Sequence, residues 1–248
     1  MSYVLSDIRD GVATLTLNDA PRRNVLSATL CSALSDAVER AGASPDVRAI
    51  VITGAAPAFC AGADLNDLRL ASEGHTAQLE AVYKSFMDVA MSPLPTLAAV
   101  NGPAVGAGFN LALACDMRIA SSDAVFDTRF LKLGLHPGGG HTWMLLRAVG
   151  WAHACRLLLA GQPADAPEAL RIGLVEALVP GGGLLDHAMD MLRSTVAAPR
   201  ELVVRTKATM RLAARSGHEA AFAHETAEQH WSLMQPGFAA TMARLQKR

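Results

Sequence analysis

The stretch NGPAVGAGFNLALACDMRIA, residues 101–120, places a glycine-rich turn, an apolar helix and a short apolar strand in direct succession. It follows another apolar strand, TLAAV, at residues 96–100. Strands that alternate with helices in this way predict an α/β fold. The small residues of the turn let a ligand approach the backbone, and the helix N-terminus offers unpaired N–H groups to it.

A second turn of the same kind lies at residues 58–65, AFCAGADL. The pattern predicts a strand end, a turn of small residues and a helix with Asp64 in its first turn. A tight turn with a capping aspartate explains this segment alone. Two such turns, however, can aim two backbone N–H groups at one oxygen, which is the arrangement of an oxyanion hole. Neither turn has the glycine spacing of a phosphate-binding loop or of a dinucleotide fingerprint.

The rest of the first 192 residues continues the alternation of strands and helices. Ser27 is the expected N-cap of a helix that Gly42 closes, and Trp143 and Trp151 are expected in the core. Further strands are predicted at 12–17, 48–54, 117–120 and 124–126, and a further helix at 77–90.

The last part of the chain has helix-forming residues and no strand pattern. Helices are expected at 201–215, at 219–233 and from Gly237 onward. We therefore predict a core of residues 1–192 and a C-terminal helical region of residues 193–248. Such a region needs a partner for its apolar face, and an oligomer interface provides one.

Composition excludes several classes of function. The 248 residues are 51% hydrophobic and 18% charged, with a net charge of -1, so a large core is expected and no general attraction for nucleic acid or an anionic membrane. No apolar run reaches the roughly 18 residues of a membrane span, and Met1–Asp7 lacks the pattern of a secretory signal. A cytoplasmic protein with free, buried thiols is expected, because no CxxC pair occurs among Cys31, Cys60, Cys115 and Cys155.

The two turns together point to a known family. FCAGADL followed by NGPAVGAGFNLALACDMRIAS closely resembles the two signature blocks of the crotonase superfamily, the enoyl-CoA hydratase/isomerase family. Residues 17–26 resemble its N-terminal block, and residues 126–140, with LGLHPGGG, its third block. The resemblance covers essentially the whole chain. It implies a crotonase-like spiral of ββα units, a C-terminal helical trimerisation region in a homotrimer or homohexamer, and an acyl-CoA thioester as ligand. No cofactor is implied beyond the coenzyme A of the substrate.

The resemblance also assigns roles to individual residues. The thioester oxygen would lie between the N–H groups of Ala63 and Ala107, which would stabilise an enolate. Arg22 and Lys247 would meet the phosphates of coenzyme A, although each could equally be solvated surface. The full set expected to bind substrate is Arg22, Ala61, Asp64, Leu65, Asn110, Phe130 and Lys247.

The acidic residues of the family are absent from their usual positions. Hydratases carry glutamates where this chain has Asn110 and Phe130, and some isomerases and dehalogenases carry an aspartate where it has Gly138. A positioned general acid or base contributes about 10²–10⁴ in rate, whereas an oxyanion-hole donor contributes about 10²–10³. We therefore expect ligand binding and enolate stabilisation without efficient hydration.

Other groups can be considered as replacements. His136 and Asp127 are the candidates for a proton-transferring group, because both lie in the third block. The alternatives are that His136 and His141 bond loop backbone and that Asp127 pairs with Arg129. No metal site is expected from the two histidines, because the sequence places no third ligand.

Asp67 and Glu73, on or after the first oxyanion helix, could also face the pocket or a solvated helix surface.

Three functions follow from these residues. The first is an enzyme acting on a coenzyme A thioester through an enolate, by slow hydration, isomerisation or decarboxylation. The second is a catalytically silent acyl-CoA-binding protein. The third is a structural trimer whose ligand site is vestigial.

Overall fold

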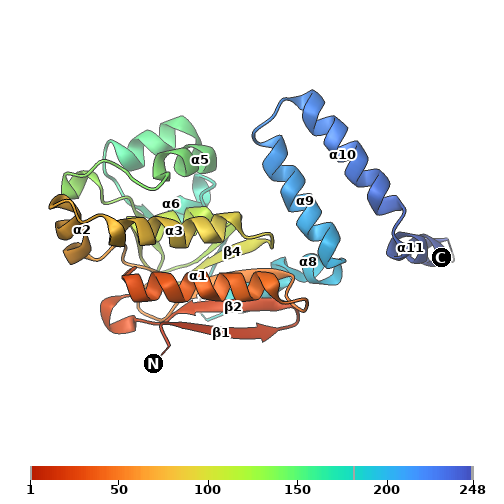
Figure 1. Cartoon of the computed structure of the whole chain (residues 1–248). Coiled ribbons are helices and arrows are strands. Elements are labelled where there is room, and N and C mark those ends of the chain that lie inside the picture. Colours follow the sequence, from red (N-terminus) through yellow and green to blue (C-terminus); the bar gives the residue numbers. More distant parts are fainter. Residues whose placement is uncertain (1, 181, 247–248) are drawn as a thin grey trace.

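The computed structural model describes residues 2–180 and 182–246, in which two sheets and their covering helices form the body of the molecule (Figure 1). The larger sheet has the order β1-β2-β3-β4-β6-β9, antiparallel between β1 and β2 and parallel elsewhere. Its strands are Val4–Arg9, Val12–Leu17, Ala49–Gly54, Thr96–Val100, Met117–Ser121 and Ala177–Val179. The smaller sheet has the order β5-β7-β8, with strands Ala104–Val105, Val125–Asp127 and Ala164–Asp165.

The chain winds as a spiral of strand–strand–helix units. β4 adds to the large sheet, β5 to the small sheet, and α4 follows; β6, β7 and α5 repeat that course. An isolated bridge between Cys60 and Ala104 extends the small sheet to the segment after β3. The helices are α1 Ala28–Ala43, α2 Leu65–Ser72, α3 Ala77–Met91, α4 Ala107–Ala114, α5 His141–Leu158, α6 Ala166–Arg171, α7 Leu184–Met191, α8 Arg193–Ala197, α9 Arg200–Ala213, α10 His218–Leu233 and α11 Pro236–Leu245.

The central strands β3 and β4 of the large sheet are buried on both faces, whereas the edge strand β1 is mostly exposed. Alternate residues such as Leu15 and Ile52 point into the main core, which α1, α3, α4 and α5 cover. Their neighbours, such as Val51, form a second core with Leu184 and Leu192. Parallel strands need cover on both faces, which explains why β3 and β4 consist mainly of apolar residues. No helix of the described residues has the length and apolar character to cross a membrane.

Local sequence signals placed most element boundaries correctly. Ser27 is the N-cap of α1, and its side chain accepts a hydrogen bond from the Leu30 amide. The helix runs through Gly42 to Ala43, so the prediction that Gly42 ends it was wrong by one residue. The three C-terminal helices lie within one or two residues of their predicted starts.

The prediction that two tryptophans of α5 lie in the core was wrong. Trp143 is 53% exposed and Trp151 74% exposed. The Trp143 ring instead has the Arg147 guanidinium 3.7 Å from its centroid, a cation–π contact at the surface.

The four cysteines are free thiols: Cys31, Cys60 and Cys115 are buried, and Cys155 is half-buried. Burial raises the pKa of Cys60 and of Cys115 to about 12.

Basic side chains of α9 fasten the C-terminal region to the core. Arg200 donates to the carbonyls of Gly42 and Val47, and Arg211 to those of Ala90 and Ser92. These contacts place cations at the carboxyl ends of α1 and α3, where helix dipoles favour them. Beyond α9, the blue helices α10 and α11 extend away from the core (Figure 1).

Lys207 is the most buried of these anchors, only 7% exposed. Its ammonium donates to the Leu94 carbonyl at 2.7 Å and to the Asp116 carboxylate at 2.5 Å. The same carboxylate accepts from the amide and hydroxyl of Thr96, at the start of β4.

Replacing Lys207 by Met is therefore expected to lower the free energy of unfolding by about 1–3 kcal/mol, because the Leu94 carbonyl and the Asp116 carboxylate each lose one donor. Lys84→Met is the matched control, since Lys84 forms an exposed pair with Asp88 one turn away on α3 and should matter little. Urea unfolding midpoints of the two variants test this expectation. Equal midpoints would mean that the anchor does not stabilise the fold.

Candidate functional site

A large pocket opens where the parallel strands β3 and β4 end. Its volume is about 1000 Å³, and its walls are mainly apolar. The loops after β3 and β4 supply one wall, α2 and α3 a second, and residues 125–138 a third. Ligands of α/β proteins bind at this carboxyl edge of a sheet.

The two turns singled out in the sequence meet in this pocket. The Cys60 amide donates to the Pro103 carbonyl at 3.1 Å, and the Val105 amide donates to the Cys60 carbonyl at 3.0 Å. Glycine is required for this approach. A Cβ atom on Gly108 would lie 2.2 Å from the Cys60 carbonyl oxygen, and one on Gly62 would lie 2.7 Å from that of Val105. The two loops therefore form one backbone unit.

Asn24 holds the first loop in place. The side chain is fully buried, and its amide nitrogen lies 2.8 Å from the carbonyl oxygens of Ala55 and Ala58. Its oxygen accepts from the Asp19 amide. Asn24 has a positive φ of 57°, a conformation that asparagine adopts more readily than most residues. The loop after β3 is thus fixed by side-chain bonds as well as by the second loop.

Ala63 and Ala107 line the pocket at the ends of these two loops. Ala107 is the first residue of α4, where the amide has no partner within the helix. Ala63 follows Gly62, whose φ of 101° turns the chain there. Within the described ranges, neither amide donates to another backbone group. The structure therefore brings the two predicted residues to one cavity.

The predicted coenzyme A contacts lie at the mouth of the pocket. Arg22 and Leu65 line it and are exposed, Leu65 at 70%. Asp64 caps α2 by accepting from the Asn66 amide, and it also pairs with Arg22 at 3.2 Å. The capping interpretation of Asp64 is therefore correct, and Ala61 lies beside it on the wall. Lys247 lies outside the described residues.

Asn110 has its side chain engaged within the protein. The carboxamide nitrogen donates to the Gly138 carbonyl at 2.9 Å. Its oxygen is 2.5 Å from Nδ1 of His141 and must accept, so Nδ1 carries the proton of a neutral imidazole. Asn110 thus ties α4 to the segment from Gly138 to His141.

His141 is buried beneath the pocket floor, 1% exposed. Its ring forms T-shaped contacts with the rings of Phe109 and Phe130, at centroid distances of 5.2 and 5.0 Å. Burial lowers the pKa of His141 to about 4, so the ring stays neutral. Its second nitrogen, Nε2, is buried without a partner among the described groups. The prediction that His141 bonds loop backbone was wrong: it bonds the Asn110 side chain, from the first turn of α5.

Asp127 and His136 both line the pocket but differ in surroundings. Asp127 is buried and pairs with Arg129 at 3.0 Å and Lys132 at 3.3 Å, so the predicted ion pair with Arg129 is present. His136 is exposed, and its Nδ1 lies 2.8 Å from the Pro137 carbonyl oxygen.

Phe130 and Gly138 occupy the other two positions where acids were looked for, and both line the pocket. Beside Gly138 stands a residue that the sequence interpretation missed, Tyr83 of α3. Only its place at the edge of the apolar face of α3, next to buried Val82 and Phe86, could have indicated it.

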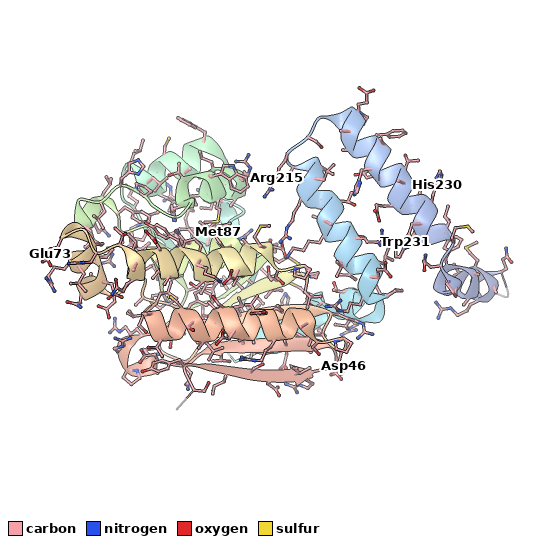
Figure 2. The ribbon with its side chains drawn as sticks, in the orientation of Figure 1. Asp46, Glu73, Met87, Arg215, His230 and Trp231 are labelled. Atoms are coloured by element: carbon pink, nitrogen blue, oxygen red, sulfur yellow. The ribbon has the colours of Figure 1, made fainter. Side chains whose placement is uncertain are left out.

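Neither Asp67 nor Glu73 is among the residues that line the pocket. Figure 2 shows Glu73 at the outer side of α2, where it pairs with Arg69. For Glu73 the interpretation as a solvated helix residue is correct.

Comparison with known proteins identifies the family of this chain. A model described as enoyl-CoA hydratase/isomerase matches residues 7–236. The chain belongs to this family. "Probable enoyl-CoA hydratase EchA14" of Mycobacterium tuberculosis is 48% identical over 253 residues, covering 99% of this chain and 98% of the relative. The "1,2-epoxyphenylacetyl-CoA isomerase" of Escherichia coli is 36% identical over 204 residues, 80% and 78% of the two chains.

A solved structure extends the likeness to the whole fold. The enoyl-CoA hydratase of Polaromonas sp. JS666 superposes with a TM-score of 0.90 at 32% identity, covering 99% of this chain and 97% of that one. The enoyl-CoA hydratase/isomerase spiral of strand–strand–helix units is thereby confirmed, and with it membership of the crotonase superfamily.

The buried His141 makes stability depend on pH in this family member. Its folded-state pKa of about 4 lies below the unfolded value near 6.5, so only the unfolded chain binds the proton between these values. The free energy of unfolding should therefore fall by about 3 kcal/mol as pH drops from 6.5 to 4.

His141→Gln, which retains a donor for Asn110, should flatten this part of the pH profile. The matched control is His136→Gln on the exposed loop, which should leave it unchanged. Urea unfolding at half-unit pH steps measures both. Identical slopes in the wild type and in His141→Gln would refute the assignment.

Proposed function

We propose that this chain binds acyl-CoA thioesters and stabilises a thioester enolate between the amides of Ala63 and Ala107. One observation carries the proposal: Ala63 and Ala107, whose N–H groups have no backbone acceptor among the described residues, line one pocket on loops that are bonded to each other. Fixed dipoles of this kind stabilise charge that develops on an oxygen, because they need no reorganisation during the reaction.

The mouth of the pocket suits the phosphorylated part of coenzyme A. Arg22 lies there, as does Arg23, a second cation that the sequence interpretation missed. Guanidinium groups bind phosphate oxygens through paired hydrogen bonds. Ala61, Asp64 and Leu65 would form the wall along the ligand. The proposed chemistry uses no cofactor beyond the coenzyme A of the substrate.

The favoured reaction is one that needs little acid–base help from the protein, an isomerisation or a decarboxylation. Asn110 is neutral and tied to Gly138 and His141, while Phe130 makes the opposite wall apolar. Hydration would lack both usual carboxylates and should be slow. The name of the Escherichia coli relative, an isomerase, supports this choice. Of the two remaining candidates for proton transfer, Asp127 is held in an ion pair, which leaves exposed His136.

A catalytically silent acyl-CoA-binding protein is the second candidate. The engagement of Asn110 in protein hydrogen bonds favours it, because no proton acceptor then stands at that position. The two aimed amides favour the enzyme, since binding alone has less use for them.

Ala107→Pro is a direct test of the oxyanion hole. Proline fits the first position of a helix, so the substitution removes one N–H group with little cost to the fold. Catalytic turnover of crotonyl-CoA or another acyl-CoA in a panel should fall about 10²–10³-fold. Ala107→Gly, which keeps the amide, is the matched control and should remain active.

Each outcome separates the candidates. Turnover that survives Ala107→Pro unchanged would remove the oxyanion hole from the mechanism. Tight acyl-CoA binding without turnover in the wild type would support the silent binder. Failure of the wild type to bind any acyl-CoA would leave the third hypothesis, a structural trimer with a vestigial ligand site.

We also propose a homotrimer or homohexamer in a reducing, cytoplasmic compartment, to which the four free cysteines are suited. The arm formed by α10 and α11 carries exposed apolar side chains, including Phe222, Phe238 and Met234, the last 84% exposed. Trp231 lies between α9 and α10, with the Arg205 guanidinium 4.1 Å from its ring centroid (Figure 2). An isolated arm of this kind is unfavourable in water.

Analytical ultracentrifugation should find three or six copies per particle. Met234→Glu should shift the distribution to smaller species, because it buries a charge in the proposed interface. A wild-type protein that sediments as a monomer at micromolar concentration would contradict the assembly.

A further inference from the structure

Tyr83 projects from α3 to the part of the pocket where the third acid of some relatives would stand. Its ring packs against Phe86, with 5.9 Å between centroids. A Cβ atom on Gly138 would lie 2.4 Å from the Tyr83 hydroxyl oxygen, and one on Gly139 2.9 Å from the ring. The phenol therefore occupies the space that any side chain at position 138 would enter.

The Tyr83 hydroxyl is available to a ligand. Tyr83 lines the pocket and is only half-buried. Burial of the ring raises the pKa of the phenol, so it stays protonated at neutral pH and can donate a hydrogen bond. No other neutral hydroxyl of an aromatic residue lines the described pocket.

The surroundings of Tyr83 are those of the acyl part of a ligand. Arg22 and Leu65 are exposed at the mouth, whereas Tyr83 is half-buried beside fully buried Phe86 and Asn110. The neighbouring walls are apolar and include Leu79 of α3. A thioester held at Ala63 and Ala107, with its coenzyme A at the mouth, directs its acyl chain into this interior.

We propose that the Tyr83 hydroxyl selects acyl groups that carry an oxygen beyond the thioester carbonyl, a hydroxyl or a ketone, by donating a hydrogen bond to it. This inference rests on the proposed binding of acyl-CoA. A hydroxyl donor set among apolar walls favours such ligands, because a plain alkyl chain removes water from the phenol without replacing its hydrogen bond. Tyr83 is thus a specificity-determining residue, and Gly138 is small because the phenol needs its space.

The test compares the affinities of butyryl-CoA, 3-hydroxybutyryl-CoA, 4-hydroxybutyryl-CoA and acetoacetyl-CoA by isothermal titration calorimetry. Tyr83→Phe removes only the hydroxyl and keeps the ring against Phe86. It should weaken at least one oxygenated ligand about tenfold and leave butyryl-CoA unchanged or tighter. The matched control is Tyr3→Phe, because Tyr3 is the only other tyrosine of the chain and is exposed.

Fluorotyrosine labelling gives a second readout that a structural role would not move. The two tyrosines should give two ¹⁹F resonances, and only that of Tyr83 should respond differently to oxygenated and plain ligands. If the wild type binds these ligands and Tyr83→Phe leaves their ratios unchanged, the selection by Tyr83 is overturned and acyl-CoA binding stands. If the wild type binds no ligand at all, the proposed function itself fails, and the inference with it.

Discussion

The contact between two backbone loops is the constraint on which the site depends. The loops after β3 and β4 exchange hydrogen bonds at Cys60, and they approach so closely that Gly62 and Gly108 have no room for a side chain. Each loop also carries one of the two amides that we propose for the oxyanion hole, at Ala63 and at Ala107, which line the pocket. Because the loops are joined, the distance between these amides is set by the fold. An oxyanion hole needs this kind of rigidity, since its donors act without rearranging.

The rest of the fold supports that contact from several sides. The parallel strands deliver both loops to the same edge of the sheet, and the two apolar cores hold the strands in register. Asn24 adds hydrogen bonds to the first loop from a position in the sequence some thirty residues earlier. At the carboxyl ends of α1 and α3, Arg200 and Arg211 of α9 donate hydrogen bonds to backbone carbonyls. Polar side chains thus connect segments that are distant in sequence wherever backbone groups would otherwise lack partners.

Around Asn110, packing and neutral hydrogen bonds hold the interior of the pocket. Asn110 connects α4 to the third block, and His141 remains neutral among aromatic rings. A carboxylate in place of Asn110 would lie directly against that buried imidazole. Gly138 leaves its space to the phenol of Tyr83. These neutral groups are mutually consistent, because Asn110 bonds both Gly138 and His141 while Tyr83 fills the space beside Gly138.

The sequence by itself determined the alternation of strands and helices, the two glycine turns, the three C-terminal helices and the family, because periodicity, caps and glycine spacing are local properties. It also marked Ala63 and Ala107 as a pair. Only the tertiary structure decided which side chains face the pocket. Several features depend on how elements pack against one another. These are the exposure of Trp143 and Trp151, the ion pair of Asp127, the hydrogen bond between Asn110 and His141, and the position of Tyr83 beside Gly138. Hydrophobicity and spacing do not specify such contacts, since they are set by how one element packs against another.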